Sequence, residues 1–366
     1  MLKKYLTITV FLLLSYFVSG QSAKYSNEFL SLGIGARGLA MSGALAAATN
    51  DGYSGYWNPA GMIYMQKAKN LAIMHAEYFA GIAKYDYGVF ASKAGQKSAI
   101  SFSLIRFGVD NIPNTSQLID AEGNINYDKV TAFSAADYAF TISYSHRTAI
   151  EGFSYGLNTK IIRRVAGDFA KSWGFGIDAG ALYKKKAWLF GAMFRDITTT
   201  VNSWSYTLSD DMIDVFTRTG NLIPVSSTEI TLPSLTLAAA YNFTLGESFS
   251  LLTELDAFVT SDGKRNVLIS AKPFSIDPKF GFELGYKNIV FLRGGIGNFQ
   301  KETSTAGEMR TSFQPNIGLG VLIKKTVAID YALTDIGNQS IALYSNVFSI
   351  RFIFNTKSGQ EYYEEK

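Results

Sequence analysis

The chain has 366 residues, of which 47% are hydrophobic and 14% aromatic, and it carries 33 glycines but only 7 prolines. Such a composition favours β structure, and large barrels of this length form a single domain. The net charge is +4 without a basic block, which argues against a nucleic-acid partner. The absence of cysteine excludes disulfides, zinc–cysteine sites, thiolate nucleophiles and a lipid-modified N-terminus.

Residues 1–20 have the layout of a secretory signal peptide. Lys3 and Lys4 supply a positive start, Leu6 to Val18 form an apolar run, and Val18-Ser19-Gly20 are suited to a cleavage site. The alternative is a membrane-anchoring helix, but the apolar run is shorter than the roughly 20 residues that a span needs. No later segment resembles a transmembrane helix, so any membrane residence is predicted to be as a β-barrel.

The next segment, residues 21–68, differs from the rest of the chain because it is crowded with small residues. Small side chains let a backbone lie close against other backbones, so we predict that this segment is a plug inside a narrow enclosure. Gly33 to Gly38 match the G-x-G-x-x-G spacing of a dinucleotide-binding turn. That turn needs a preceding buried strand and an acid about 20 residues on, whereas no apolar strand precedes Gly33 and Asp51 comes too early.

Four short motifs in this segment carry a resemblance to a known family. They are Phe29-Leu30-Ser31-Leu32, Gly35-Ala36-Arg37, Met41-Ser42-Gly43-Ala44 and Tyr56-Trp57-Asn58-Pro59-Ala60-Gly61-Met62. Together they resemble the N-terminal signature of the PorV/PorQ family, a Bacteroidetes branch of the FadL-like outer-membrane barrels. The resemblance implies an outer-membrane barrel of a Gram-negative bacterium of that group, with the N-terminal segment plugging its lumen.

Downstream of the plug segment the sequence alternates with period two. Tyr138, Phe140, Ile142 and Tyr144 fall on one face of a predicted strand, and alanine, threonine and serine lie between them. A soluble sandwich would alternate as well, with its apolar face turned inward. Here the apolar faces are continuous and aromatic at their ends, while the polar faces carry small residues and occasional charges. That combination favours lipid outside, a polar lumen inside and aromatic girdles at the interfaces.

We therefore predict an all-β fold, a transmembrane antiparallel β-barrel of about 14 strands over residues 69–354. The predicted strands are 71–79, 85–92, 98–107, 137–146, 153–165, 173–183, 187–195, 233–243, 248–259, 278–287, 290–299, 313–323, 327–335 and 346–354. Because a closed barrel has no free edge, the last strand is expected to pair with the first.

The predicted links alternate in length. Those after even-numbered strands are short, and the longest links after odd-numbered strands are 110–136, 196–232 and 261–277. Short periplasmic turns and long external loops are typical of bacterial outer-membrane barrels, and an even strand number puts both termini in the periplasm. The polar C-terminal tail, 355–366, is predicted to be disordered.

Strand phase puts nine charged residues on the polar, lumen-facing side. These candidate lumen charges are Lys160, Asp178, Arg195, Glu254, Asp256, Glu283, Arg293, Asp330 and Arg351. A lipid-facing lysine or arginine at mid-depth would cost about 2–4 kcal/mol, so the lumen is the favourable place for them. Either they only hydrate and brace the interior, or they line a polar pathway or a head-group site, and the pattern leaves both readings open.

Arg37 is the strong charge in the opening half of the plug segment. We predict that it pins the plug by pairing with lumen carboxylates such as Glu254 or Asp256, and the resembling family pattern also has an arginine here. Trp57-Asn58-Pro59 is predicted to form the turn from the plug into the first strand, because Asn-Pro fixes a turn through side-chain hydrogen bonding and a locked φ. We interpret this turn as a structural joint and not as a ligand site.

Catalysis is not expected. His75 and His146 are isolated in the sequence and lack the spacing of a metal site or a catalytic triad, so we predict no metal, no cofactor and no enzymatic activity. The long loops hold a predicted amphipathic helix at 210–219 and apolar stretches at 222–225 and 341–344. These stretches either bind a partner or pack over the barrel mouth.

Two functions from different classes follow. The resemblance implies a role in type IX secretion, in which PorV-like members accompany the translocon and receive cargo through its C-terminal signal domain, and PorQ-like members belong to the attachment complex. In that case translocon or attachment-complex proteins and secreted cargo are partners, besides outer-membrane lipid. The alternative is a FadL-like transporter that passes long-chain fatty acids or other hydrophobic compounds past a moving plug. Secretion is the leading prediction.

Overall fold

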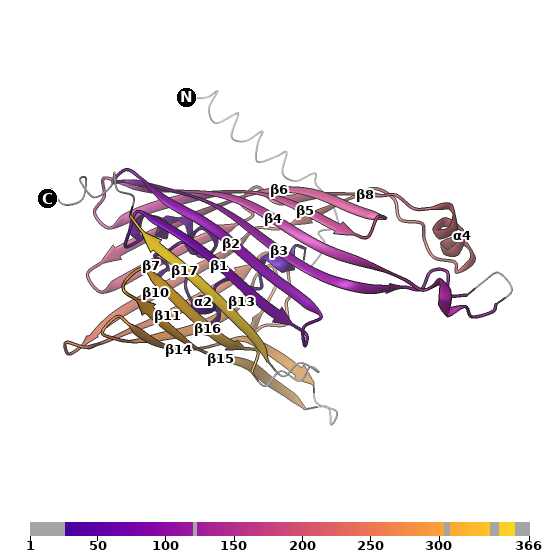
Figure 1. The fold of residues 1–366 in the computed structure, drawn as a ribbon. Coiled ribbons are helices and arrows are strands. Elements are labelled where there is room, and N and C mark those ends of the chain that lie inside the picture. Colours follow the sequence, from indigo (N-terminus) through magenta and orange to yellow (C-terminus); the bar gives the residue numbers. More distant parts are fainter. Residues whose placement is uncertain (1–25, 120–122, 304–307, 337–343, 356–366) are drawn as a thin grey trace.

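The computed structural model describes residues 26–119, 123–303, 308–336 and 344–355, in which one antiparallel sheet closes on itself (Figure 1). Fourteen strands form the ring: β1 (Lys69–Tyr78), β2 (Ala83–Ala94), β3 (Ser98–Asn114), β4 (Thr131–Arg147), β5 (Phe153–Ala166), β6 (Ala170–Lys185), β7 (Trp188–Arg195), β10 (Ser234–Leu245), β11 (Phe249–Thr260), β13 (Ser275–Tyr286), β14 (Val290–Thr303), β15 (Met309–Ile323), β16 (Val327–Thr334) and β17 (Ser345–Phe354).

Closure of the ring joins the last strand to the first. The register of β1 and β17 runs from Lys69 opposite Phe354 to Glu77 opposite Asn346. The predicted all-β fold, a closed antiparallel barrel of 14 strands, is thereby confirmed. The predicted signal peptide, 1–20, and residues 356–366 of the predicted tail lie outside the described residues.

The three longest predicted links are not plain loops, and the sequence prediction is wrong there. β3 extends to Asn114, and β4 already begins at Thr131. Their pairing continues past a bulge between Val109 and Ile112. Further along, the ring carries extra pieces, namely β8 (Thr200–Tyr206), α4 (Asp210–Arg218), β9 (Ser227–Thr231) and β12 (Ile269–Ser270). Backbone pairing continues beyond the apolar belt. The strands there have no apolar face, so the sequence pattern does not indicate them.

Helix α4 coincides with the predicted amphipathic helix and lies at the long-loop end of the barrel (Figure 1). It begins after Ser209, whose hydroxyl accepts a hydrogen bond from Met212 N at 3.3 Å. Asp210 and Asp211 occupy its first turn, where acidic side chains suit the helix dipole. No helix in the described part of the chain is long and apolar enough to cross a membrane.

The wall strands present apolar side chains outward and polar or small ones inward. On β5, Leu157 and Ile161 are exposed, whereas Asn158 and Lys160 are buried in the lumen. Each wall strand needs this period-two division because successive side chains point to opposite faces of a sheet. The result is an apolar outer belt of the kind that hydrocarbon covers.

Residues 26–65, here called the inner segment, lie within the ring. They contain four short helices: η2 (Glu28–Leu30), α2 (Ala36–Ala40), α3 (Ser54–Trp57) and η3 (Pro59–Tyr64). α2 contacts β14 to β17, whereas η3 contacts β2 to β6, chiefly β4 and β5. Because β4 and β5 lie apart from β14 to β17 along the closed sheet, the segment bridges the lumen. Figure 1 shows α2 inside the ring.

Wall glycines let the backbone of the inner segment touch the sheet. A Cβ atom added to Gly156 on β5 would lie 2.5 Å from Ala60 N. One added to Gly295 on β14 would lie 2.4 Å from Met41 C. Any side chain at these positions therefore displaces main chain, and small residues are required on both sides of the contact.

We expect Gly156→Val to undock η3 while the ring stays closed, because overpacking costs typically about 1–3 kcal/mol. Hydrogen exchange should then become faster in residues 54–65, while heat-modifiable migration on gels shows an intact barrel. The control is Gly88→Val on β2, where an added Cβ meets nothing within 4 Å. Unchanged exchange in Gly156→Val would contradict close backbone contact at this wall.

Candidate functional site

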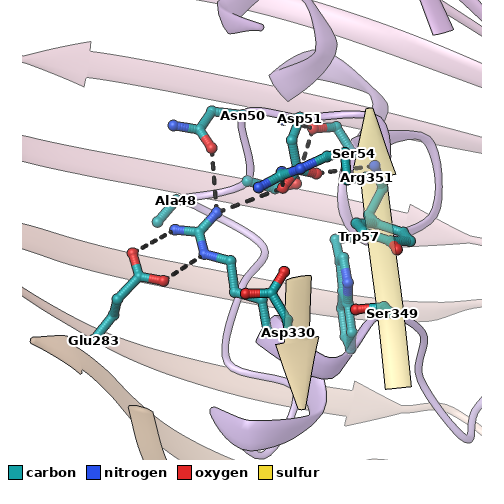
Figure 2. Close-up of polar contacts among 12 residues, drawn as sticks. Ala48, Asn50, Asp51, Ser54, Trp57, Glu283, Asp330, Ser349 and Arg351 are labelled. Carbon is teal, nitrogen blue, oxygen red and sulfur yellow. Dashed lines mark hydrogen bonds and ion pairs between the residues drawn. The ribbon is translucent and has the colours of Figure 1, made fainter. Parts of the chain in front are cut away.

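Arg37 on α2 is the centre of the polar contacts inside the lumen. Its guanidinium binds Glu283 on β13 with two parallel hydrogen bonds, Nε to Oε2 at 2.8 Å and Nη2 to Oε1 at 3.1 Å. Its Nη1 donates to Asn50 Oδ1 at 3.2 Å and lies 3.8 Å from Asp51 Oδ2. Figure 2 shows Glu283 and Asn50 on either side of this guanidinium. Paired, bidentate contacts of this kind give an arginine a fixed orientation.

The wall extends these contacts in both directions. Arg293 Nε lies 2.6 Å from Glu283 Oε2, and Arg293 Nη1 lies 2.7 Å from Asp330 Oδ1. On the other side, Arg351 of β17 pairs with Asp51. We call these six residues, Arg37, Asp51, Glu283, Arg293, Asp330 and Arg351, the Arg37 network. Three cations face three carboxylates, so the network is neutral as a whole.

Arg37 pairs with a lumen carboxylate, as predicted, but that carboxylate is Glu283 and not Glu254 or Asp256. Those carboxylates face a different part of the inner segment and accept its backbone N–H groups. Glu254 binds Ala47 N at 2.6 Å and Ala48 N at 3.0 Å, and Asp256 binds Ala46 N at 3.3 Å. The reason is the path of the chain: α2 carries Arg37 toward β13, and residues 46–48 run past β11.

A second ionic cluster joins β5, β6 and the residue that follows β7. Lys160 Nζ is 2.8 Å from Asp178 Oδ1 and 2.6 Å from Asp196 Oδ1. Arg195 binds the inner segment directly, since its Nη2 donates to Tyr56 O at 2.9 Å and its guanidinium lies 4.4 Å from the centre of the Tyr56 ring. These contacts secure the inner segment on the side of the ring away from the Arg37 network.

The prediction that Trp57, Asn58 and Pro59 form the turn into the first strand is wrong. They join α3 to η3, and β1 begins ten residues after Pro59 at Lys69 because η3 intervenes. Asn58 caps η3 by accepting Ala60 N at 3.1 Å, and its Nδ2 donates to Ala46 O at 2.9 Å. Trp57 Nε1 donates to Ile34 O at 3.1 Å. The three residues tie distant parts of the inner segment together.

Sequence reasoning missed Asp51 and Asp196 as members of the ionic clusters. Asp51 was weighed only as a dinucleotide-binding acid, and Asp196 was placed in a loop. It also treated His75 and His146 as isolated, whereas His75 Nδ1 lies 2.7 Å from Asp86 Oδ1 and His146 Nδ1 lies 2.9 Å from Ser98 Oγ. These partners come from adjacent strands, which linear spacing does not reveal. Within the described ranges no group of three or more His, Cys, Asp or Glu is placed to hold a metal ion.

Of the cavities beside the inner segment, two lie on opposite sides of it. The larger, about 680 Å³, is at the long-loop end, where Leu39 and Trp57 of the inner segment face Phe258 and Asn316 of the wall. The smaller, about 370 Å³, is at the short-turn end and is lined by the Arg37 network. The inner segment thus separates the space near the long loops from the space near the short turns.

Comparison with known proteins identifies the fold. No protein-family model matches the chain, and no curated protein matches it in sequence. Solved structures match most of it. The toluene transporter TbuX of Ralstonia pickettii is 13% identical, with 88% of this chain and 98% of that chain covered and a TM-score of 0.53. The CymD monoaromatic hydrocarbon channel is 12% identical, with 89% and 98% covered and a TM-score of 0.56.

A Pseudomonas aeruginosa FadL homologue is 14% identical, with 86% of this chain and 97% of that chain covered and a TM-score of 0.52. At these identities the likeness establishes the fold alone. It gives no support to the finer PorV/PorQ assignment, which still depends on the N-terminal motifs. The fold of the barrel is similar to that of the toluene transporter TbuX and of the FadL homologue.

Proposed function

We propose that this chain is a non-enzymatic outer-membrane transporter for small hydrophobic compounds. The observation that carries the proposal is a FadL-like ring whose lumen holds the chain's own N-terminal segment between two cavities. The structurally similar proteins include a toluene transporter and a monoaromatic hydrocarbon channel. The compounds named for these proteins support small hydrophobic compounds as the cargo of this chain.

In the proposed orientation the long loops face the outside, and the short turns and both termini face the periplasm. The inner segment is then the plug. A compound from outside first reaches the larger cavity and passes on only when the plug moves, because buried side chains such as Ile34, Met41 and Leu45 fill the space beside it.

The Arg37 network is the proposed anchor of the plug. Removing one partner of a buried ion pair leaves an uncompensated charge and costs about 3–5 kcal/mol. A plug held in this way can move only if each buried charge keeps its ion-pair partner or gains another partner. This argument favours a limited shift of the inner segment over its complete release from the barrel.

A role in type IX secretion is the second candidate, and the N-terminal motifs quoted above are the observation that favours it. In that case the rim and the long loops bind translocon or attachment-complex proteins and secreted cargo, and no compound crosses the lumen. Exposed apolar side chains at the long-loop end, such as Leu222 and Val225 beyond α4, suit a protein partner.

Locking the plug tests transport directly. Ser42 Oγ of the inner segment accepts a hydrogen bond from Asn316 Nδ2 of β15 at 2.7 Å, and the chain has no native cysteine. In proteoliposomes, a short bis-methanethiosulfonate cross-linker, which forms a disulfide with each thiol of the double variant Ser42→Cys/Asn316→Cys, should lower by about tenfold the toluene uptake that exceeds that of protein-free liposomes, because the plug can no longer change position. A reductant should restore uptake, and the two single variants serve as controls. Uptake that persists through the cross-linked barrel would rule out this route.

Deletion of the gene separates the two candidate functions. We expect slower uptake of toluene and long-chain fatty acids, and unchanged secretion of surface proteins, because the cargo of a transporter is small. Radiolabelled uptake and a surface-protein profile measure the two outcomes in one strain. Lost surface proteins with normal uptake, together with translocon proteins co-purifying from the outer membrane, would instead establish the secretion role.

Arg37→Ala tests the anchor. It leaves Asp51 and Glu283 with one cation fewer, so we expect the plug to lose about 3 kcal/mol of docking free energy and residues 36–51 to exchange amide hydrogens over about a hundredfold faster. The control is Arg218→Ala on α4, an exposed partner of Asp214, where a surface pair contributes about 0–1 kcal/mol. Equal protection in the two variants would remove Arg37 as the anchor.

A further inference from the structure

The larger cavity has the size of a ligand pocket. Its volume of about 680 Å³ falls within the roughly 300–1,000 Å³ that such pockets span. It lies between the inner segment and the inward faces of β11, β13, β14, β15, β16, β17 and β1. The chemistry of its two sides differs, and the difference bears on which compounds it accepts.

One side of the cavity is apolar. Leu39 and Trp57 of the inner segment, Tyr78 at the end of β1, and Phe258 on β11 supply aliphatic and aromatic surface. Trp57 and Tyr78 are themselves held in place, since both are buried. These side chains suit the apolar part of a ligand, because they present aliphatic and aromatic surface to it.

Another part of the lining carries a row of amide side chains on β14 and β15. Gln300 Nε2 donates to Asn298 Oδ1 at 2.9 Å, and Asn298 Nδ2 donates to Gln314 Oε1 at 2.5 Å. Asn316 Nδ2 continues the row to Ser42 of the inner segment. Among the described residues, the Oε1 atom of Gln300 and the Nε2 atom of Gln314 have no protein partner. The row therefore offers a ligand both an acceptor and a donor.

The charges of the cavity do not favour an ion. Arg265 is engaged by Asp262 at 2.7 Å and by Glu28 at 3.3 Å. Asp277 is partly buried, and its Oδ1 atom has no hydrogen-bond partner among the described residues. Lys279 Nζ lies over the Phe258 ring, 5.3 Å from its centre. An anionic ligand meets Asp277 and Asp335, and a cationic ligand meets Lys279, so a charged head is opposed in either case.

We propose that this cavity binds uncharged amphiphiles, with a hydroxylated head on the amide row and an apolar tail against Leu39, Trp57 and Phe258. A bare hydrocarbon would displace water from Gln300, Gln314 and Asp277 without replacing its hydrogen bonds. A head that both donates and accepts replaces them. The inference rests on the proposed function in one respect, that the cavity is where a transported compound first binds.

The test is a set of four probes with similar apolar parts: hexyl β-D-glucoside, hexanoate, hexylamine and toluene. Binding to the full mature chain in nanodiscs is measured by calorimetry and corrected with empty nanodiscs. We expect hexyl glucoside to bind about tenfold more tightly than each of the other three, because only its head satisfies the amide row. Toluene or either ion binding as tightly as the glucoside would overturn the proposal.

Two variants locate the effect. Gln300→Leu/Gln314→Leu should weaken hexyl glucoside about tenfold and strengthen toluene, since it makes the row apolar. Asp277→Asn should strengthen hexanoate, because it removes a charge that opposes the carboxylate. The matched control is Asn242→Leu in the smaller cavity, which should change none of the affinities. An unchanged preference in both cavity variants would also overturn the proposal.

The binding result and the transport result are separable. If the cavity prefers hexyl glucoside but cross-linking of Ser42→Cys/Asn316→Cys does not change toluene uptake, this inference holds and the proposed transport route is ruled out. If the cavity prefers toluene and the cross-link lowers toluene uptake, the transport proposal holds and this inference is ruled out.

Discussion

Hydrocarbon offers the protein no hydrogen bonds, and this constraint governs the rest of the structure. Every backbone N–H and C=O of a lipid-facing wall needs a partner within the wall, so the sheet has to close. β17 meets β1 over nine residue pairs to do so. A ring of this many strands is wider than its own inward side chains fill, since about eight strands already suffice for a side-chain-filled interior. Closure thus creates a lumen that something else has to occupy.

The inner segment fills that lumen with irregular backbone, and the wall supplies the partners that a regular sheet or long helix would provide. Glu254 accepts two consecutive backbone N–H groups, and Arg195 donates to a backbone carbonyl. The lumen charges are therefore used as hydrogen-bond partners for the segment. Of the two readings that the sequence left open for them, these contacts favour bracing, and the neutral balance of the Arg37 network agrees with that role.

The sequence was sufficient to predict the wall, because period-two alternation is local and each strand repeats it. It was not sufficient for contacts across the lumen. Arg37 and Glu283 are 246 positions apart, and their meeting depends on the register around the whole ring and on where α2 ends. Asp51 and Asp196 carry no local signature at all. The prediction of the long links as loops failed for a related reason, because β8 and β9 lie beyond the apolar belt and lack its alternation of apolar and polar residues.

The two cavities differ in how their polar groups are satisfied, and this difference assigns them different tasks. Around the smaller cavity, guanidinium and carboxylate groups mostly bind one another, and only donors, Asn70 Nδ2 and Arg351 Nε, are buried there without a partner among the described residues. Around the larger cavity, amides and Asp277 keep unused hydrogen-bonding capacity beside apolar surface. A ligand there touches Leu39 and Trp57, which belong to the moving element in the proposed mechanism. Because a ligand shifts a conformational equilibrium only by its difference in affinity between two states, the contacts that select the compound are also those that can displace the plug.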